Sequence, residues 1–223
     1  LVLARGRVIA QNGQVRVDLP SFPYPEWAIH SVHLGRRLQA QDFRLAAPAG
    51  AEVAMAHVIG ILENQAPNRH LRLQVPVVRG EIFPDPARDL AKIALVERHR
   101  GSGRVQVGLV QGFGFNVPCA VATTVAHDSH QMIVVGTSEA EMALAANALG
   151  ELDGGQIVVR QGEVIGKVSL PIAGLMSNQR AELVARQAAT VLEGFRLCGC
   201  TLNNPNMQLS LSALVVIPEL RIS

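Results

Sequence analysis

The fold class is decided by residues 132–170, which read MIVVGTSEAEMALAANALGELDGGQIVVRQGEVIGKVSL. The run opens with the apolar residues 132–135, which are typical of a short buried strand. Ser138 follows as a candidate helix N-cap, with Glu141 in the spacing of a capping box, so we expect a helix over 138–149. The run therefore passes from a strand to a helix within a few residues.

The second half of the same run predicts a β-hairpin. Residues 156–160 and 163–170 are strand-like and flank the turn Gln161-Gly162. Residues 92–99 and 104–110 flank a glycine-containing turn in the same way. Hairpins thus outnumber β-α-β crossovers, and this pattern predicts an α+β fold.

Four further segments complete the expected domain. Residues 178–197 carry apolar side chains near helical spacing, and Gly199 follows at the expected helix end. Residues 71–75 alternate between apolar and polar and predict a half-buried strand. We expect a turn over 203–206 and a long buried strand over 207–217. The sequence therefore predicts a strand-rich domain with about two main helices.

The beginning of the chain differs from this body. The β-type runs 2–9 and 14–17 flank Asn12-Gly13, a strong hairpin turn, and a proline-rich segment follows. An isolated hairpin is marginal in water, so we expect this one to belong to a sheet completed by other strands. The boundaries that we predict are 1–18 for the hairpin, 19–33 for a linker and 34–223 for the α+β domain.

Composition excludes several classes of protein. Hydrophobic residues make up 48% and charged residues 17% of the 223 positions, which supports a packed core and argues against disorder. The net charge of +2 and the scarcity of aromatic residues argue against nucleic-acid binding. No apolar run is long enough for a membrane span. The cysteines Cys119, Cys198 and Cys200 form neither a disulfide framework nor a usual zinc pairing, so we expect reduced thiols in a cytoplasmic protein.

Groups that can carry chemistry gather at His127-Asp128-Ser129-His130, directly before the apolar run 132–135. A histidine here could transfer protons near neutral pH, and Asp128 could orient an imidazole. On a strand, positions three apart face opposite sides, so His127 and His130 can act together only if the chain turns between them. The competing interpretation is a polar turn whose side chains bond local backbone.

Two other patterns indicate structure rather than chemistry. His30 and His33 repeat the spacing of the first pair but have no nearby carboxylate except Glu26, which gives little support for a metal site. Residues 108–115 contain closely spaced glycines after a strand, but Pro118 follows and the pattern is not a dinucleotide-binding fingerprint. We expect these glycines to permit a tight turn.

Five blocks of the sequence occur in the order in which one enzyme family carries them. The blocks are Asp18–Trp27, Gly108–Gly114, Val125–Gln131, Leu170–Ser177 and Leu214–Leu220. In these blocks the chain resembles the adenine deaminases of the amidohydrolase superfamily. The block at 125–131 is similar to that family's Ala-His-Asp-Ser-His-Asn signature, with Gln131 where asparagine is more usual.

The resemblance implies hydrolysis of adenine to hypoxanthine and ammonia. It also implies that a divalent metal, manganese or iron, activates water in a (β/α)8 barrel upstream of this chain. No metal ligand carries over onto this chain, so we expect no bound metal and no activity from it alone. The hairpin would then belong to a small composite β domain, and the partners would be adenine, the barrel and further copies of the enzyme.

For the candidate site, the resemblance suggests that the domain packs on the barrel and presents the loop at the active-site mouth. Asp128, His127 and His130 are the catalytic candidates, and Ser129 is the candidate substrate-binding residue. Three alternatives stay open. The domain could be purely structural or oligomeric, the enzyme could act on another purine or amidine, or His127, Asp128 and His130 could form an independent metal module.

Overall fold

A computed structural model describes residues 1–20 and 22–223 of the chain. The strands are β1 (Val2–Ala4), β2 (Arg7–Gln11), β3 (Gln14–Val15), β4 (Leu45–Ala46), β5 (Val53–Gly60), β6 (Arg69–Pro76), β7 (Glu81–Ile82), β8 (Leu90–Val96), β9 (Val105–Gln111), β10 (Cys119–Thr123), β11 (Met132–Gly136), β12 (Gly155–Arg160) and β13 (Glu163–Ser169). The helices are α1 (Glu26–Ile29), α2 (Glu139–Glu151), α3 (Ala181–Leu197) and α4 (Pro205–Leu211), with the 3₁₀ turns η1 (Ala40–Phe43) and η2 (Pro86–Arg88). The fold is α+β and rich in strands, as the sequence predicts.

One large mixed sheet organises the domain. Its strand order is β13-β12-β10-β11-β8-β9-β5-β6, so β13 and β6 lie at its edges. Neighbouring strands are antiparallel except for β5 and β9, which run parallel. The predicted hairpins are confirmed as β8–β9 and β12–β13, and the short strand 132–135 is confirmed as β11.

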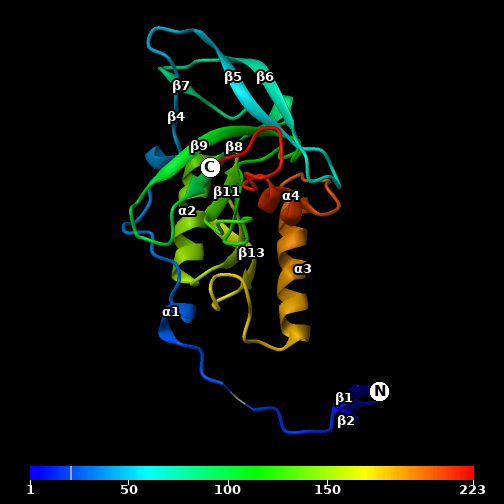
Figure 1. The fold of residues 1–223 in the computed structure, drawn as a ribbon. Coiled ribbons are helices and arrows are strands. Elements are labelled where there is room, and N and C mark those ends of the chain that lie inside the picture. The colour runs from blue at the N-terminus through cyan, green and yellow to red at the C-terminus, as the bar shows by residue number, and fades with distance from the viewer. Residues whose placement is uncertain (21) are drawn as a thin grey trace.

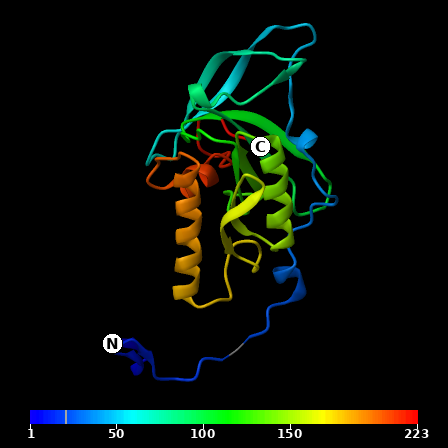
Figure 2. The same ribbon diagram turned by 180° about the vertical axis from the view of Figure 1, so that it is seen from behind.

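Helices cover both faces of the part of this sheet that contains β10 to β13, with α2 on one face and α3 on the other (Figures 1 and 2). On one face, the core includes Val121 and Ile133 and packs against Phe195 of α3 and Leu209 of α4. On the other face, the core is formed largely by α2, the neighbouring strands and Phe43 of η1. Alternate residues of a strand point to opposite faces, which is why consecutive apolar residues in the central strands supply both cores. Among the described residues, no helix is long and apolar enough to cross a bilayer.

The prediction of a strand over 207–217 is wrong, because residues 207–211 belong to the helix α4 and residues 212–217 form turns. The side chain of Asn204 accepts a hydrogen bond from the Met207 backbone N–H at 3.3 Å, and Pro205 occupies the first helical turn. Proline is favoured at this position because it has no N–H to leave unpaired. The expected turn over 203–206 is therefore a helix start. An apolar run does not by itself distinguish a strand from a buried helix.

The first segment is also more broken than expected. Arg5 and Gly6 both have positive φ and make a second tight turn, so the predicted strand 2–9 splits into β1 and β2. The result is a separate three-stranded sheet, which lies apart from the main domain (Figure 1). Within the proline-rich segment, the short helix α1 begins after Pro25. The domain boundaries at 18 and 33 stay predictions.

The predicted helix over 138–149 is confirmed, but its capping box is only half formed. Ser138 accepts a hydrogen bond from the Glu141 N–H, as expected of an N-cap. The Glu141 carboxylate instead accepts a bond from the Gly162 N–H at 3.0 Å. It thus ties α2 to the β12–β13 turn rather than closing the box. The long helix predicted from 178 begins at Ala181.

Candidate functional site

The polar segment 127–130 lies in the connection between β10 and β11 and forms a closed turn. The His130 N–H donates to the Ala126 carbonyl at 2.7 Å, and His130 has a positive φ of 49°. Asp128 and Ser129 are exposed, whereas His127 and His130 are partly buried. The chain therefore makes the turn that a joint role of the two histidines requires.

This turn brings the two imidazoles together. The ring centroids of His127 and His130 lie 5.5 Å apart, with the planes tilted by 56°. Nδ1 of His127 is in hydrogen-bonding contact with Oγ of Ser210 in α4. Burial lowers the pKa of His130, and His127 and Arg98 add to the shift while Asp128 opposes it. His130 is therefore biased towards the neutral imidazole, which can accept a proton.

A buried arginine, Arg98, braces this turn from beneath. It is 1% exposed, and its Nε donates to the His130 carbonyl at 2.6 Å. Its two terminal nitrogens donate to the carbonyls of Ser31 at 2.9 Å and Ala173 at 3.0 Å. Burial lowers its pKa, yet an arginine stays charged because its ordinary pKa is so high. Sequence reasoning missed Arg98, because nothing in its local pattern distinguishes a buried arginine from an exposed one.

The loop that contains Ala173 and Gly174 packs against the same arginine. Thr124 Oγ1 donates to the Gly174 carbonyl at 2.6 Å and accepts from the Gly155 N–H at 2.8 Å. A Cβ on Gly174 would lie only 2.9 Å from an Arg98 terminal nitrogen. A side chain at this position would therefore collide with the brace.

A third loop supports the turn through Glu97. Its carboxylate accepts hydrogen bonds from the backbone N–H groups of His99, Arg100 and Ser102. Burial alone would raise the pKa of Glu97, but the bonds from Ser102, Arg100 and His99 outweigh burial and hold it at about 2. Nε2 of His99, in the loop that Glu97 orders, lies 2.9 Å from the Ser129 carbonyl. The exposed tip of the turn is therefore held from two sides.

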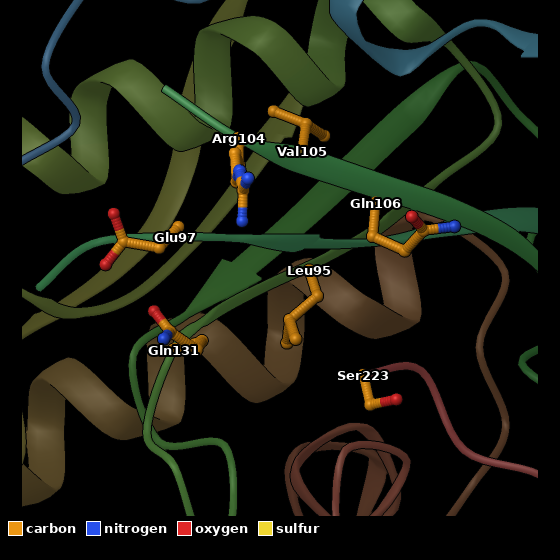
Figure 3. Close-up of a pocket in the computed structure, with 7 residues that line it drawn as sticks. All are labelled: Leu95, Glu97, Arg104, Val105, Gln106, Gln131 and Ser223. Carbon is orange, nitrogen blue, oxygen red and sulfur yellow. The ribbon is translucent and has the colours of Figure 1, made fainter. Parts of the chain in front are cut away.

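A cleft of about 550 Å³ opens beside this assembly (Figure 3). Its lining consists of Leu95, Glu97, Arg104, Val105, Gln106, Gln131 and Ser223. Gln131 connects the cleft to the turn, because its Oε1 accepts a hydrogen bond from the Arg98 backbone N–H at 2.9 Å. His127 and His130 do not line the cleft, so it is a neighbour of the turn rather than a pocket around it.

The described residues do not fit a resident catalytic metal. Across residues 1–20 and 22–223, no three side chains of histidine, cysteine, aspartate or glutamate gather closely enough to hold an ion. His30 instead contacts Asp153 at 3.1 Å and Glu26 at 3.4 Å, whereas His33 uses its backbone N–H on the Arg98 carbonyl. The two residues therefore have separate contacts, and the repeated spacing of His30 and His33 does not bring them together as a pair of metal ligands.

Comparison with known proteins identifies the class to which this domain belongs. Residues 65–223 match the model of the adenine deaminase C-terminal domain, and this chain belongs to that family. Four of the five sequence blocks that carry the resemblance lie within that match, including the turn at 127–130.

Particular relatives extend the match over the whole chain. The chain is 53% identical to an adenine deaminase of Ruegeria pomeroyi and 52% identical to adenine deaminase 3 of Rhizobium meliloti. It is 46% identical to an adenine deaminase of Moorella thermoacetica. Each alignment covers all of this chain but 37% of the relative, so the chain spans little more than a third of the curated relatives it matches.

Proposed function

We propose that this chain is the C-terminal portion of an adenine deaminase that converts adenine and water to hypoxanthine and ammonia. The observation that carries the proposal is the braced turn, which brings His127, Asp128 and His130 together inside the domain that matches the family. In the hydrolysis, water adds at the purine carbon that bears the amino group, and that amino group leaves as ammonia. We assign the catalytic divalent metal, manganese or iron, to the barrel outside this chain, because no three potential ligands gather among the described residues.

The exposed groups of the turn suit contact with a purine. Asp128 and Ser129 project from the domain surface, and a carboxylate and a hydroxyl can hydrogen-bond ring nitrogens. Neutral His130 can accept a proton, and the contact with Ser210 holds the imidazole of His127 in place beside it. Asp128, His127 and His130 are therefore the proposed proton-transfer groups, with Ser129 as the proposed substrate contact.

The barrel is proposed to pack at the end of the domain where the linker enters. Arg98 ties this end together, since it bonds both Ser31 of the linker and His130 of the turn. Large apolar side chains are exposed on the linker and on the 171–177 loop, with Trp27 at 78% and Met176 at 56%. Exposed apolar groups that cluster around a candidate site are typical of an interface. A homo-oligomer contact is the other proposed use of these residues.

The test is the Asp128→Asn variant in the full-length enzyme. We expect kcat/KM for adenine to fall at least about tenfold, which corresponds to about 1.4 kcal/mol of transition-state stabilisation. Glu163→Gln is the matched control, because Glu163 is exposed on the edge strand β13. An effect of Asp128→Asn below about twofold would exclude a role for this carboxylate in the chemistry.

A purely structural role is the second candidate, and one observation favours it. Many of the hydrogen bonds that hold the turn are made by its own backbone groups, as in a polar turn that has only a structural role. Full activity in a folded enzyme with a shortened 127–130 loop would support this candidate. We also expect the chain alone to be inactive, and a separately purified barrel to restore activity if the two parts assemble.

A further inference from the structure

A second pair of histidines lies on the main sheet, away from the turn. His57 is in β5 and His70 is in the edge strand β6, and both are exposed. In the register of these antiparallel strands, His57 faces Arg72 and Ile59 faces His70. His57 and His70 are therefore diagonal neighbours on the same face, within reach of each other's rings.

The two rings meet through nitrogen atoms. Nδ1 of His57 lies 2.5 Å from Nε2 of His70, and the ring centroids are 4.8 Å apart. Two imidazole nitrogens that bind one tetrahedral ion at about 2.0–2.1 Å each lie roughly 3.3 Å apart. A rotation of the exposed rings that opens the contact by less than about 1 Å would admit an ion.

We propose that His57 and His70 form a two-imidazole site for a borderline divalent transition-metal ion such as Zn²⁺ or Cu²⁺. Imidazole nitrogen is a preferred ligand of both ions. On binding, Nδ1 of His57 and Nε2 of His70 coordinate the ion. The hydrogen that they share moves by exchange with water to an outer ring nitrogen, so each ring stays neutral. This proposal departs from the expectation, drawn from the family resemblance, that the chain binds no metal, and it does not depend on the proposed deaminase function.

The surroundings leave room for the remaining ligands to be water. Both rings are exposed to solvent, and His57, but not His70, also lines a recess of about 180 Å³ with Gln106, Gly108 and Ile222. A water molecule takes up about 30 Å³, so several fit. No third histidine, cysteine, aspartate or glutamate joins the pair among the described residues, and the site is thus two imidazoles completed by water.

The neighbouring charges are mixed. Arg72 faces His57 across the strands, and Arg221 lines the recess, but its guanidinium is committed to backbone carbonyls such as Ala66 and Pro218. The Glu219 carboxylate is held beside the pair, because it accepts a hydrogen bond from the His70 N–H at 2.9 Å. These charges favour a site of modest affinity rather than a tightly held structural ion.

The test uses the full chain without an affinity tag. Cu²⁺ is titrated at pH 7.5 and followed by electron paramagnetic resonance, and Zn²⁺ is titrated by calorimetry. We expect one equivalent of Cu²⁺ with two imidazole nitrogens in its spectrum. His57→Gln and His70→Gln should each weaken binding by at least about tenfold, because even the loss of an outer-shell partner of a ligand costs that much. Both side chains are exposed, so circular dichroism should show unchanged folding.

The matched control is the double variant His127→Gln, His130→Gln, which removes the other histidine pair. We expect it to retain the binding of the unmodified chain. The proposal is overturned if the unmodified chain binds neither ion, or if His57→Gln and His70→Gln bind as tightly as it does. It is equally overturned if the control loses the ion and the His57 and His70 variants keep it.

Discussion

The two histidine pairs of this chain differ in burial and in the contacts that hold their imidazole rings. His127 and His130 are partly buried in a turn that Arg98 and Ser210 hold from the core side. His57 and His70 stand on the exposed face of two strands, where their main polar contact is with each other. The first arrangement fixes the rings and lowers the pKa of His130, whereas the second leaves both rings free to adapt to a ligand. Two imidazole rings that lie close together therefore do not by themselves define a functional site. The contacts that support the rings determine whether the pair can transfer protons or bind a ligand.

The largest expected effect comes from removing the brace of the first pair. Arg98→Met leaves the carbonyls of His130, Ser31 and Ala173 without their donor, and we expect a loss of about 3 kcal/mol in the free energy of unfolding. Denaturant titration measures this loss. Arg104→Met is the control, because Arg104 is exposed beside the cleft. Equal stability of the two variants would show that the first pair needs no brace.

Gly174 allows the same brace to be disturbed without removing it. Gly174→Ala adds a Cβ close to Arg98 at a residue whose φ is 71°, and we expect a loss of about 2–3 kcal/mol. Gly162→Ala is the matched control, with φ of 76° and no atom within 4 Å of the added Cβ, and should cost about 1 kcal/mol. The difference between the losses of unfolding free energy in Gly174→Ala and Gly162→Ala measures the cost of the contact between the added Cβ and Arg98. A difference near zero would mean that the Arg98 side chain simply moves aside.

The support from Glu97 should make stability depend on pH. Its folded-state pKa of about 2 lies below the ordinary value of 4.5, so the stabilisation is complete above pH 4.5 and is lost as the pH falls towards 2. We expect Glu97→Gln to be less stable than the unmodified chain at pH 7, with the gap closing between pH 4.5 and 2. Unfolding titrations across this range measure it. If the difference in unfolding free energy between Glu97→Gln and the unmodified chain does not change with pH, the ionised Glu97 carboxylate is not its cause.

The smallest effects compare the two pairs directly in the absence of metal. Ser210→Ala removes the contact to His127 and should cost about 1 kcal/mol of unfolding free energy. His57→Gln changes an exposed ring and should alter stability by less than about 0.5 kcal/mol. Chemical denaturation of both variants measures the contrast. A larger cost for His57→Gln would show that the exposed pair is itself a structural contact.

Much of the fold follows from the sequence because local patterns determine it. The β12–β13 hairpin forms about Gln161-Gly162, and α2 starts at the N-cap Ser138, as turn and capping chemistry predict. The prediction over 207–217 is wrong because an apolar run is compatible with both a strand and a helix. Asn204 caps the helix and Pro205 starts it, so the chain is helical from residue 205.

The candidate site could be predicted only in part. The turn at His127–His130 is visible as a run of polar residues, but its brace is not, since Arg98 is distant from it in sequence and looks like any surface arginine. The His57–His70 pair depends on the register of β5 and β6, which brings together residues from two separate strands. The local sequence pattern of either strand does not predict which residues of the other strand lie beside it.

The three carbonyls that Arg98 binds also impose an order of events while the protein is made. Ser31, His130 and Ala173 are supplied by widely separated parts of the chain, and Ala173 is the last of them to leave the ribosome. A growing polypeptide that has already exposed His127 and His130 must still wait for roughly 40 further residues, a few seconds at about 5–20 residues per second, before the bracket can close. During that interval Arg98 lacks the Ala173 carbonyl, and the contact of Ser210 with His127 must wait longer still, so the histidine turn acquires all of its supports only after α4 has been made.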